Sequence, residues 1–145
     1  MKLGLGSYSY RWSIGHKDRT PSSPITCIEL LEVTSKLELD VLQIADNMPV
    51  HNIETQTLDQ LYRTAQKQGI NLEIGMQSFS TESIKLYLDI AERLDARILR
   101  IALDGNDVGT SDDIIAKEFK NILPIAEKIN CKIAIENHFA FPSYR

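Results

Sequence analysis

Short apolar runs of five to seven residues alternate along the chain with longer stretches of helical period. Runs of this length, rich in Leu, Ile and Val and bounded by turn-forming residues, are typical of β-strands. The predicted strands are Lys2–Ser7, Val41–Ala45, Asn71–Met76, Arg97–Leu103 and Lys132–Glu136.

The stretches between these strands have apolar residues at helical spacing. Ser23 is expected to be the N-cap of the first helix, with Pro24 at its first helical position. Gly69 is expected to end the second helix, and Pro124 to kink the fourth. The predicted helices are Ile25–Leu37, Leu58–Lys67, Glu82–Leu94 and a fourth that starts near Ser111.

This alternation predicts an α/β fold with a parallel sheet, either an open doubly wound sheet or a wedge of a (β/α)₈ barrel. The strands of an open parallel sheet should be apolar on both faces. Here one alternating set is bulky and apolar, whereas the other is small or polar and includes Gln43, Glu73, Arg100 and Glu136. Polar groups on one face fit a barrel interior, so we predict a (β/α)₈ TIM-barrel fold.

A closed barrel needs eight strands and about 250 residues, whereas this 145-residue chain has five predicted strands. The length fits one domain, residues 1–145, which would be the N-terminal portion of a barrel. An open wedge would expose two strand edges, which natural proteins avoid. We therefore expect either a missing C-terminal half or self-association to close the barrel.

The charge pattern argues against nucleic acid as a partner. The net charge is −4, and no run of Lys or Arg provides a basic patch. Cys27 and Cys131 are far apart and not in a CxxC pattern, so they are expected to be reduced thiols in a core. No segment has the length and hydrophobicity of a signal peptide or a membrane span. We expect a cytoplasmic protein with no membrane partner.

The best candidate for chemistry is Glu136, which ends the last predicted strand on the polar face. A carboxylate there can bind a divalent cation or act as a base. The alternative is a structural ion pair with Arg100. His138 can bind a substrate oxygen or orient Glu136, or it can be an ordinary loop residue.

Other candidates lie at the expected barrel mouth. The segment from Tyr8 to Trp12 supplies aromatic rings suited to a sugar face, or else a hydrophobic plug. After the second strand, Asp46-Asn47 and His51 lie in a loop that can reach the mouth, and His51 is a metal-ligand candidate unless it is simply solvated. Glu73 and Arg100 can contact substrate or form a charged network.

Four segments, in this order, resemble the xylose isomerase-like TIM-barrel superfamily, which includes sugar-phosphate isomerases and epimerases and has endonuclease IV as a relative. They are MKLGLGSYSYRWSIG, VLQIADNMPVHN, ILRIALD and IAIENHFAFPS.

The resemblance implies that Glu136 is the first carboxylate ligand of a divalent metal (Mn, Mg or Zn) and also an acid or base. The metal would polarise a sugar carbonyl while carboxylates move a proton through an enediolate. Tyr8, Trp12, Arg100 and His138 would bind the sugar or sugar phosphate. The remaining ligands would come from strands six to eight, so the isolated chain is expected to be inactive.

The first functional hypothesis is therefore a metal-dependent sugar isomerase or epimerase. One alternative is an endonuclease IV-like phosphodiesterase, with His51 as a ligand, which the acidic charge balance disfavours. Another is a non-catalytic half-barrel that acts as an assembly module.

Overall fold

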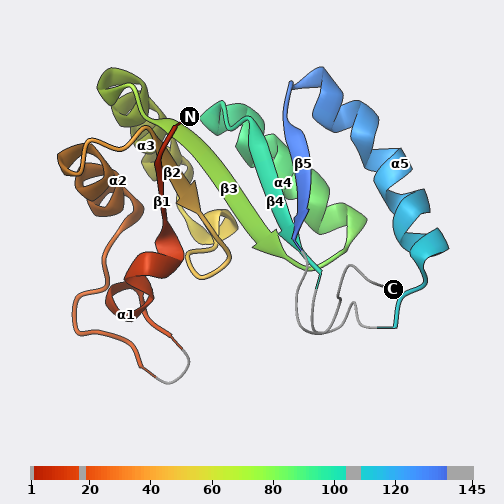
Figure 1. Ribbon diagram of the computed structural model, residues 1–145, viewed down its shortest axis with the longest axis horizontal. Coiled ribbons are helices and arrows are strands. Elements are labelled where there is room, and N and C mark those ends of the chain that lie inside the picture. The colour runs from red at the N-terminus through yellow and green to blue at the C-terminus, as the bar shows by residue number, and fades with distance from the viewer. Residues whose placement is uncertain (1, 17–18, 104–108, 137–145) are drawn as a thin grey trace.

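A computed structural model describes residues 2–16, 19–103 and 109–136 of the chain (Figure 1). Of the residues predicted to carry chemistry, His138 lies outside these ranges, as does its neighbour Asn137.

The five predicted strands form one sheet in the order β1-β2-β3-β4-β5. Every neighbouring pair is parallel, which confirms the prediction of a parallel α/β sheet. The carboxyl ends of the strands therefore meet at one edge. The strands are β1 (Gly4–Gly6), β2 (Val41–Ile44), β3 (Asn71–Gln77), β4 (Ile98–Ala102) and β5 (Lys132–Glu136).

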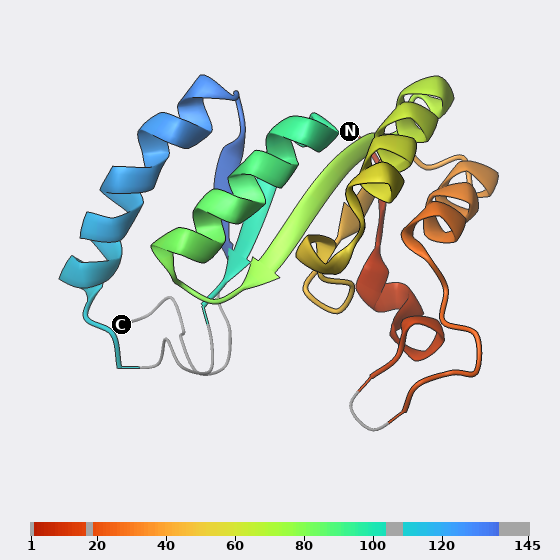
Figure 2. The same ribbon diagram turned by 180° about the vertical axis from the view of Figure 1, so that it is seen from behind.

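Helices cover one face of this sheet, as Figure 2 shows, whereas none of the described helices lies on the opposite, bare face in Figure 1. The covering helices are α2 (Cys27–Lys36), α3 (Thr55–Gln68), α4 (Thr81–Leu94) and α5 (Asp112–Lys128). A short α1 (Arg11–Ile14) and the 3-10 turns η1 (Ser7–Tyr10) and η2 (Val50–Asn52) follow the carboxyl ends of β1 and β2. One covered and one bare face are the layering expected of a barrel wedge.

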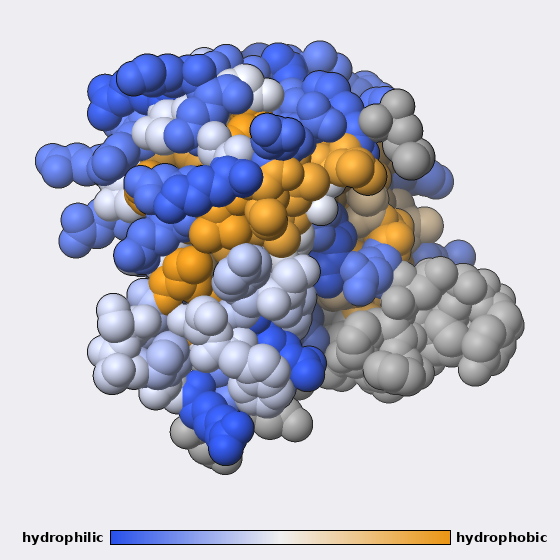
Figure 3. Space-filling view, turned by 60° about the vertical axis from the view of Figure 1, so that its left-hand side comes forward, coloured by the Kyte–Doolittle hydropathy of each residue, from blue (hydrophilic) through white to orange (hydrophobic). Residues whose placement is uncertain are grey.

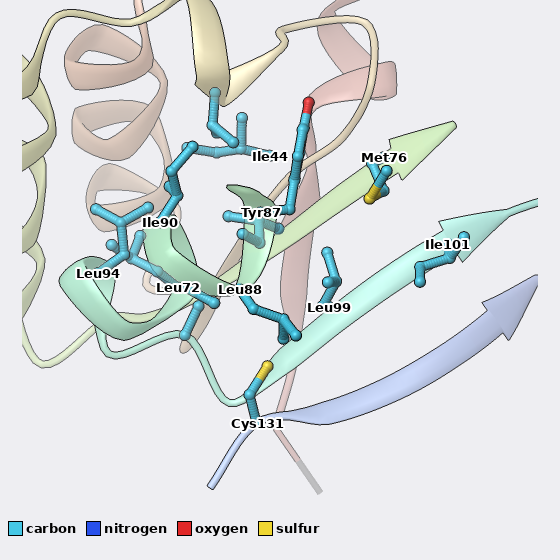
Figure 4. Close-up of a cluster of buried hydrophobic side chains, with 14 of the residues drawn as sticks. Ile44, Leu72, Met76, Tyr87, Leu88, Ile90, Leu94, Leu99, Ile101 and Cys131 are labelled. Atoms are coloured by element: carbon cyan, nitrogen blue, oxygen red, sulfur yellow. The ribbon is translucent and has the colours of Figure 1, made fainter. Parts of the chain in front are cut away.

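The core lies between the sheet and the helices. Figure 4 shows Leu72 and Leu99 from the sheet packed against Leu88 and Leu94 of α4. All four are at most 4 % exposed, so the bulky alternating set faces the helices as predicted. Cys27 and Cys131 are free and buried, and burial raises the pKa of both thiols.

The predicted start of the first helix is wrong. Helix α2 begins at Cys27, with Thr26 rather than Ser23 as its N-cap. The Thr26 hydroxyl accepts a hydrogen bond from the Glu29 backbone N–H (3.2 Å), and the Glu29 carboxylate accepts one from the Thr26 N–H (2.8 Å). This capping box satisfies two N–H groups that the end of a helix would otherwise leave unpaired, which a Ser23 cap followed by proline would not do.

The other predicted helix ends agree better with the structure. Gly69 follows α3 in the left-handed conformation, with φ 70°, as predicted for a C-terminal glycine. Helix α3 begins at Thr55, three residues before the predicted start at Leu58. The prediction missed this first turn because its residues are polar and show no apolar periodicity. Pro124 lies within α5, which is one continuous helix, so the kink there stays a prediction.

The capping box makes a testable difference between two neighbouring hydroxyl residues. Thr26→Ala is expected to lower the free energy of unfolding by about 1 kcal/mol because α2 loses its cap. Ser23→Ala removes a hydroxyl that does not cap α2 and is expected to change it by less than about 0.5 kcal/mol. Urea unfolding of both variants measures this, and equal losses would contradict the assignment of Thr26.

Apolar side chains remain exposed at both ends of the strand order. Leu3, just before β1, is 60 % exposed and Ile135 of β5 is 52 % exposed. Figure 3, turned toward the β1 and α2 side, shows an apolar area ringed by polar residues. Within the described ranges β1 and β5 each pair on one side only, as predicted for an open wedge. None of the described helices has the length and apolarity needed to cross a membrane.

Candidate functional site

A cavity of about 520 Å³ opens on the bare face of the sheet, at the carboxyl ends of the strands. Its polar lining comes from alternate strand positions and from residues that directly follow strands. The lining residues are Tyr8, Gln43, Asp46, Gln77, Arg100, Ala102 and Glu136. Side chains from all five strand regions therefore meet in one place, as the predicted polar face requires.

Arg100 lies at the centre of this lining. Its Nη1 is 3.1 Å from Asp46 Oδ1, and its Nε donates to Glu136 Oε2. The Arg100 side chain is only 14 % exposed, so the two carboxylates provide the partners that a mostly buried cation needs. The structural ion pair considered from the sequence, Arg100 with Glu136, is present.

Asp46 joins this pair to the first strand region. The Tyr8 hydroxyl donates to Asp46 Oδ2 at 2.6 Å, while Oδ1 contacts Arg100. Tyr8, Asp46, Arg100 and Glu136 thus form one chain of contacts across the mouth. From the sequence, Asp46 was noted only as part of a loop that can reach the mouth; its link to Arg100 depends on the tertiary fold.

A buried hydroxyl contacts both residues that flank Asp46, the backbone of Ala45 and the side chain of Asn47. Ser7 is fully buried, and its Oγ accepts from the Ala45 N–H at 2.9 Å and donates to Asn47 Oδ1 at 2.5 Å. These two contacts link η1, which contains Ser7, to the residues that follow β2. Each contact also satisfies a polar group near the core. Sequence reasoning missed Ser7, and a lone serine after a glycine carries no signal for this role.

A second polar pair lies further along the bare face. Gln43 Nε2 donates to Glu73 Oε2 at 3.1 Å across the β2 and β3 register. Glu73 is therefore paired with Gln43, whereas Arg100 is paired with Asp46 and Glu136. Gln43 and Gln77 line the cavity. For Gln43 the sequence did contain a signal, because the strand alternation places its side chain on the polar face.

Tyr8 is a persistent hydrogen-bond donor in this site. Burial, together with the hydrogen bond to the Asp46 carboxylate and the charge of that carboxylate, raises the pKa of Tyr8 from 10.0 to about 12. The neutral phenol is therefore favoured in the folded state. Its contribution to stability is present below pH 10 and is lost as the pH rises through 12.

An alkaline titration followed by tyrosinate absorbance tests this arrangement. Tyr8→Phe is expected to remove one ionisation near pH 12 from the curve of the folded protein. Asp46→Asn is expected to lower the pKa of Tyr8, because the charge that opposes ionisation is gone. A curve for Tyr8→Phe that coincides with that of the unmodified protein would contradict the assignment.

The structure brings together three of the predicted site residues, Tyr8, Arg100 and Glu136. Trp12 lies in α1 and lines a different pocket of about 450 Å³, together with Arg19, Thr20 and Pro21. The Trp12 indole packs edge-on against the His16 ring, with the ring centroids 5.3 Å apart, and the Arg11 guanidinium lies 4.7 Å from its ring centroid. The role of Trp12 in substrate binding stays a prediction.

His51 contacts the helix layer. Its Nδ1 is 2.8 Å from the hydroxyl of Tyr87, a buried residue of α4. Burial, with the charge of Asp46 as a smaller cause, raises the pKa of Tyr87 to about 12, so the phenol remains available to hydrogen-bond the imidazole. This contact engages Nδ1 of His51 only, so the role of His51 as a metal ligand stays a prediction.

The lining by itself does not make a metal centre. Within residues 2–16, 19–103 and 109–136, no three His, Cys, Asp or Glu side chains gather where they could hold an ion. Asp46 and Glu136 both lie in the cavity, but Arg100 occupies the space between them. Zinc sites usually take three or four protein ligands, which is more than these two carboxylates provide. The expected metal would need ligands from outside the described residues.

Comparison with known proteins supports the architecture. No family model matches the sequence. A curated relative, 3-oxo-isoapionate decarboxylase of Pectobacterium atrosepticum, is 28 % identical over 138 residues, which is 95 % of this chain and 49 % of the relative.

Several solved structures share the fold. D-psicose 3-epimerase crystallised with D-fructose has a TM-score of 0.72 and 16 % identity, covering 97 % of this chain and 54 % of that one. The D-psicose 3-epimerase of Clostridium cellulolyticum H10, crystallised with D-tagatose, has a TM-score of 0.71 and 19 % identity, covering 99 % and 55 %. The IOLI protein, whose structure holds a zinc atom, has a TM-score of 0.61 and 16 % identity, covering 93 % and 51 %.

The fold is a partial (β/α)₈ TIM barrel with five parallel strands and four covering helices between them, and the solved structures that it matches are xylose isomerase-like TIM barrels. The expected resemblance is confirmed at the level of fold. The chain spans about half the length of the relatives that it matches.

Proposed function

We propose that this chain supplies the N-terminal part of the active site of a sugar isomerase or epimerase. The observation that carries the proposal is the polar cavity at the carboxyl ends of the strands, where TIM-barrel enzymes hold their substrates. Its carboxylates, amides, phenol and guanidinium suit the many hydroxyls of a sugar. The psicose epimerases crystallised with D-fructose and D-tagatose support a ketose as the substrate class.

In this proposal Glu136 moves a proton at the carbon next to the sugar carbonyl. Loss of that proton to Glu136 leaves a planar enediolate, and a second acid, supplied from outside the described residues, would give a proton to the opposite face of the carbon and so form the epimer. Arg100 engages Oε2 of Glu136, so we assign the proton transfer to Oε1. The guanidinium orients the Glu136 carboxylate, and Asp46, which accepts from the Tyr8 hydroxyl, holds the other side of the guanidinium.

The same proposal includes a divalent metal whose coordination would be completed by ligands from outside the described residues. The zinc atom in the IOLI structure supports a metal in this fold. Glu136 would contribute one ligand, and the others would come from outside the described residues. Such an ion would stabilise negative charge on the carbonyl oxygen.

Decarboxylation of a 3-oxo sugar acid is a second candidate, favoured by the relative that matches 95 % of the chain. When a 3-oxo acid loses CO₂, the electron pair of the broken bond is left on the carbon beside the carbonyl, which again gives an enolate. A proton from Glu136 then completes the product. The two reactions therefore use the same stabilised charge and the same acid.

Solvent isotope exchange separates these candidates. The complete barrel, that is this chain with the strands that close its edges, is incubated in D₂O with D-fructose, D-tagatose or a 3-oxo sugar acid. Deuterium entering the ketose beside its carbonyl supports the epimerase, and CO₂ release with one deuterium gained supports the decarboxylase. Absence of both would refute enolate chemistry at this site.

A phosphodiesterase is disfavoured as a third candidate. Its site would need a cation to bind the phosphate, and Arg100, at the centre of the cavity lining, is already paired with the carboxylates of Asp46 and Glu136.

We also propose that the open edges at β1 and β5 are covered in the working protein. Leu3 and Ile135 present apolar surface there, and exposed parallel edges are prone to association. Light scattering of the 145-residue chain measures this. A dimer would indicate that two wedges cover one another, whereas a well-behaved compact monomer would contradict the need for a cover.

A further inference from the structure

We infer that Gly75 is a positioning residue, whose lack of a side chain gives the Arg100 guanidinium room to bridge Asp46 and Glu136. A Cβ on Gly75 would lie 2.9 Å from Arg100 Nη1 and 3.3 Å from Ala45 Cα. The first distance is below ordinary van der Waals contact, and Nη1 is the atom that contacts Asp46 Oδ1.

Backbone conformation does not explain this glycine. Gly75 lies within β3, and the described glycines with positive φ are Gly15, Gly69 and Gly109. Glycine inside a strand weakens the strand, and it often marks a close approach by another group. At Gly75 the approaching group is the guanidinium.

The register shows how the space is made. On β4, Arg100 is paired in register with Gly75 of β3 on one side and with Ala134 of β5 on the other. Ala45, which directly follows β2, lies on the other side of Gly75. A row of small residues therefore flanks the one long side chain, which lies across Gly75 toward Asp46 on one side and reaches Glu136 on the other.

The contacts of Arg100 with both Asp46 and Glu136 compensate the charges of these two carboxylates. Asp46 and Glu136 carry like charges on one cavity wall, and Arg100 is the cation between them. Moving Nη1 away from Asp46 would leave a carboxylate without its ionic partner at low exposure, which is unfavourable. Only the link to chemistry at Glu136 rests on the proposed function; the placement of the guanidinium does not.

Gly6 provides a matched control. It occupies the same bare face in β1, beside Gln43, and a Cβ there would have no atom within 4 Å. Gly6→Ala therefore makes the same chemical change without touching the guanidinium.

The first test is the NMR signal of the Arg100 Nη1–H in the 145-residue chain. In the unmodified protein and in Gly6→Ala, this proton is expected to exchange slowly with water because Asp46 accepts it. In Gly75→Ala, exchange is expected to be about tenfold faster or more, as for loss of a charge-assisted hydrogen bond. Unchanged exchange in Gly75→Ala would overturn the inference.

The second test asks which neighbour the added methyl group meets. The fall in melting temperature caused by Gly75→Ala is measured alone and again in an Arg100→Ala background. If the guanidinium is the obstacle, most of the fall disappears in that background. An equal fall in both would assign the clash to the Ala45 backbone and overturn the inference.

If Gly75→Ala does not fold, the double variant still decides. Folding of Gly75→Ala/Arg100→Ala would support the inference, and failure of the double variant to fold, while Arg100→Ala alone folds, would overturn it. Neither measurement uses a substrate, so failure of the proposed reaction leaves this result intact.

Discussion

Replacing Glu136 by glutamine is expected to lower turnover of the complete barrel by about 10²–10⁴-fold, the usual contribution of a general acid or base. Glutamine has nearly the same size and keeps an oxygen that can accept from Arg100, so the fold should be retained. It cannot take up a proton at neutral pH, and it is a poorer metal ligand than a carboxylate. Deuterium exchange into the ketose measures the chemical step, and circular dichroism checks the fold.

Glu73→Gln is the matched control for this substitution. Glu73 is also a carboxylate on the bare face, but its partner is Gln43 and it does not line the cavity. We expect a loss of less than about threefold, consistent with the small effects of changes away from a functional site. Near-normal turnover in Glu136→Gln would remove Glu136 from the site. Equal losses in both variants would indicate that overall charge on the face matters, rather than chemistry at Glu136.

Shortening Leu99 to alanine is expected to lower the free energy of unfolding by about 2–5 kcal/mol. Leu99 is on β4, is 0 % exposed and packs between the sheet and α4 (Figure 4). Removing its side chain loses buried apolar area and leaves a cavity that close-packed neighbours fill only partly. Urea unfolding at constant pH measures the change from the shift in midpoint.

Leu86→Ala controls for the change in residue type. Leu86 lies on α4 but is 48 % exposed, so much less apolar area is lost. We expect a change of less than about 1 kcal/mol, because surface substitutions rarely do more. A loss as large as that of Leu99→Ala would mean that Leu86 is covered in solution, as association of two chains would bring about.

Several features were predictable because they depend on local periodicity. The two-residue repeat of a strand assigns Leu42, Leu72 and Leu99 to one face, and Gln43 and Arg100 to the other. Since a one-residue slip would reverse every side chain, the buried face strongly specifies the register. The same repeat places Glu136 on the polar face, and it is found lining the cavity.

Other features were missed because their signals are weak or compete. The Thr26-x-x-Glu29 capping box is a sequence signal, but a serine followed by proline three residues earlier was also plausible as a helix start. Trp12 was expected beside Tyr8 because the two are close in sequence. The short helix α1 carries Trp12 to another pocket, since successive turns point side chains in different directions.

The sequence by itself determined the parallel sheet, its apolar and polar faces, and the position of Glu136 at the end of a strand. These follow from repeats of two and 3.6 residues, which any segment displays without its neighbours. Only the tertiary structure decided that Asp46 and Glu136 share Arg100, and that Gly75 makes the room for it. Those contacts join segments far apart in the chain, so they exist only once parallel strands are aligned and their carboxyl ends meet.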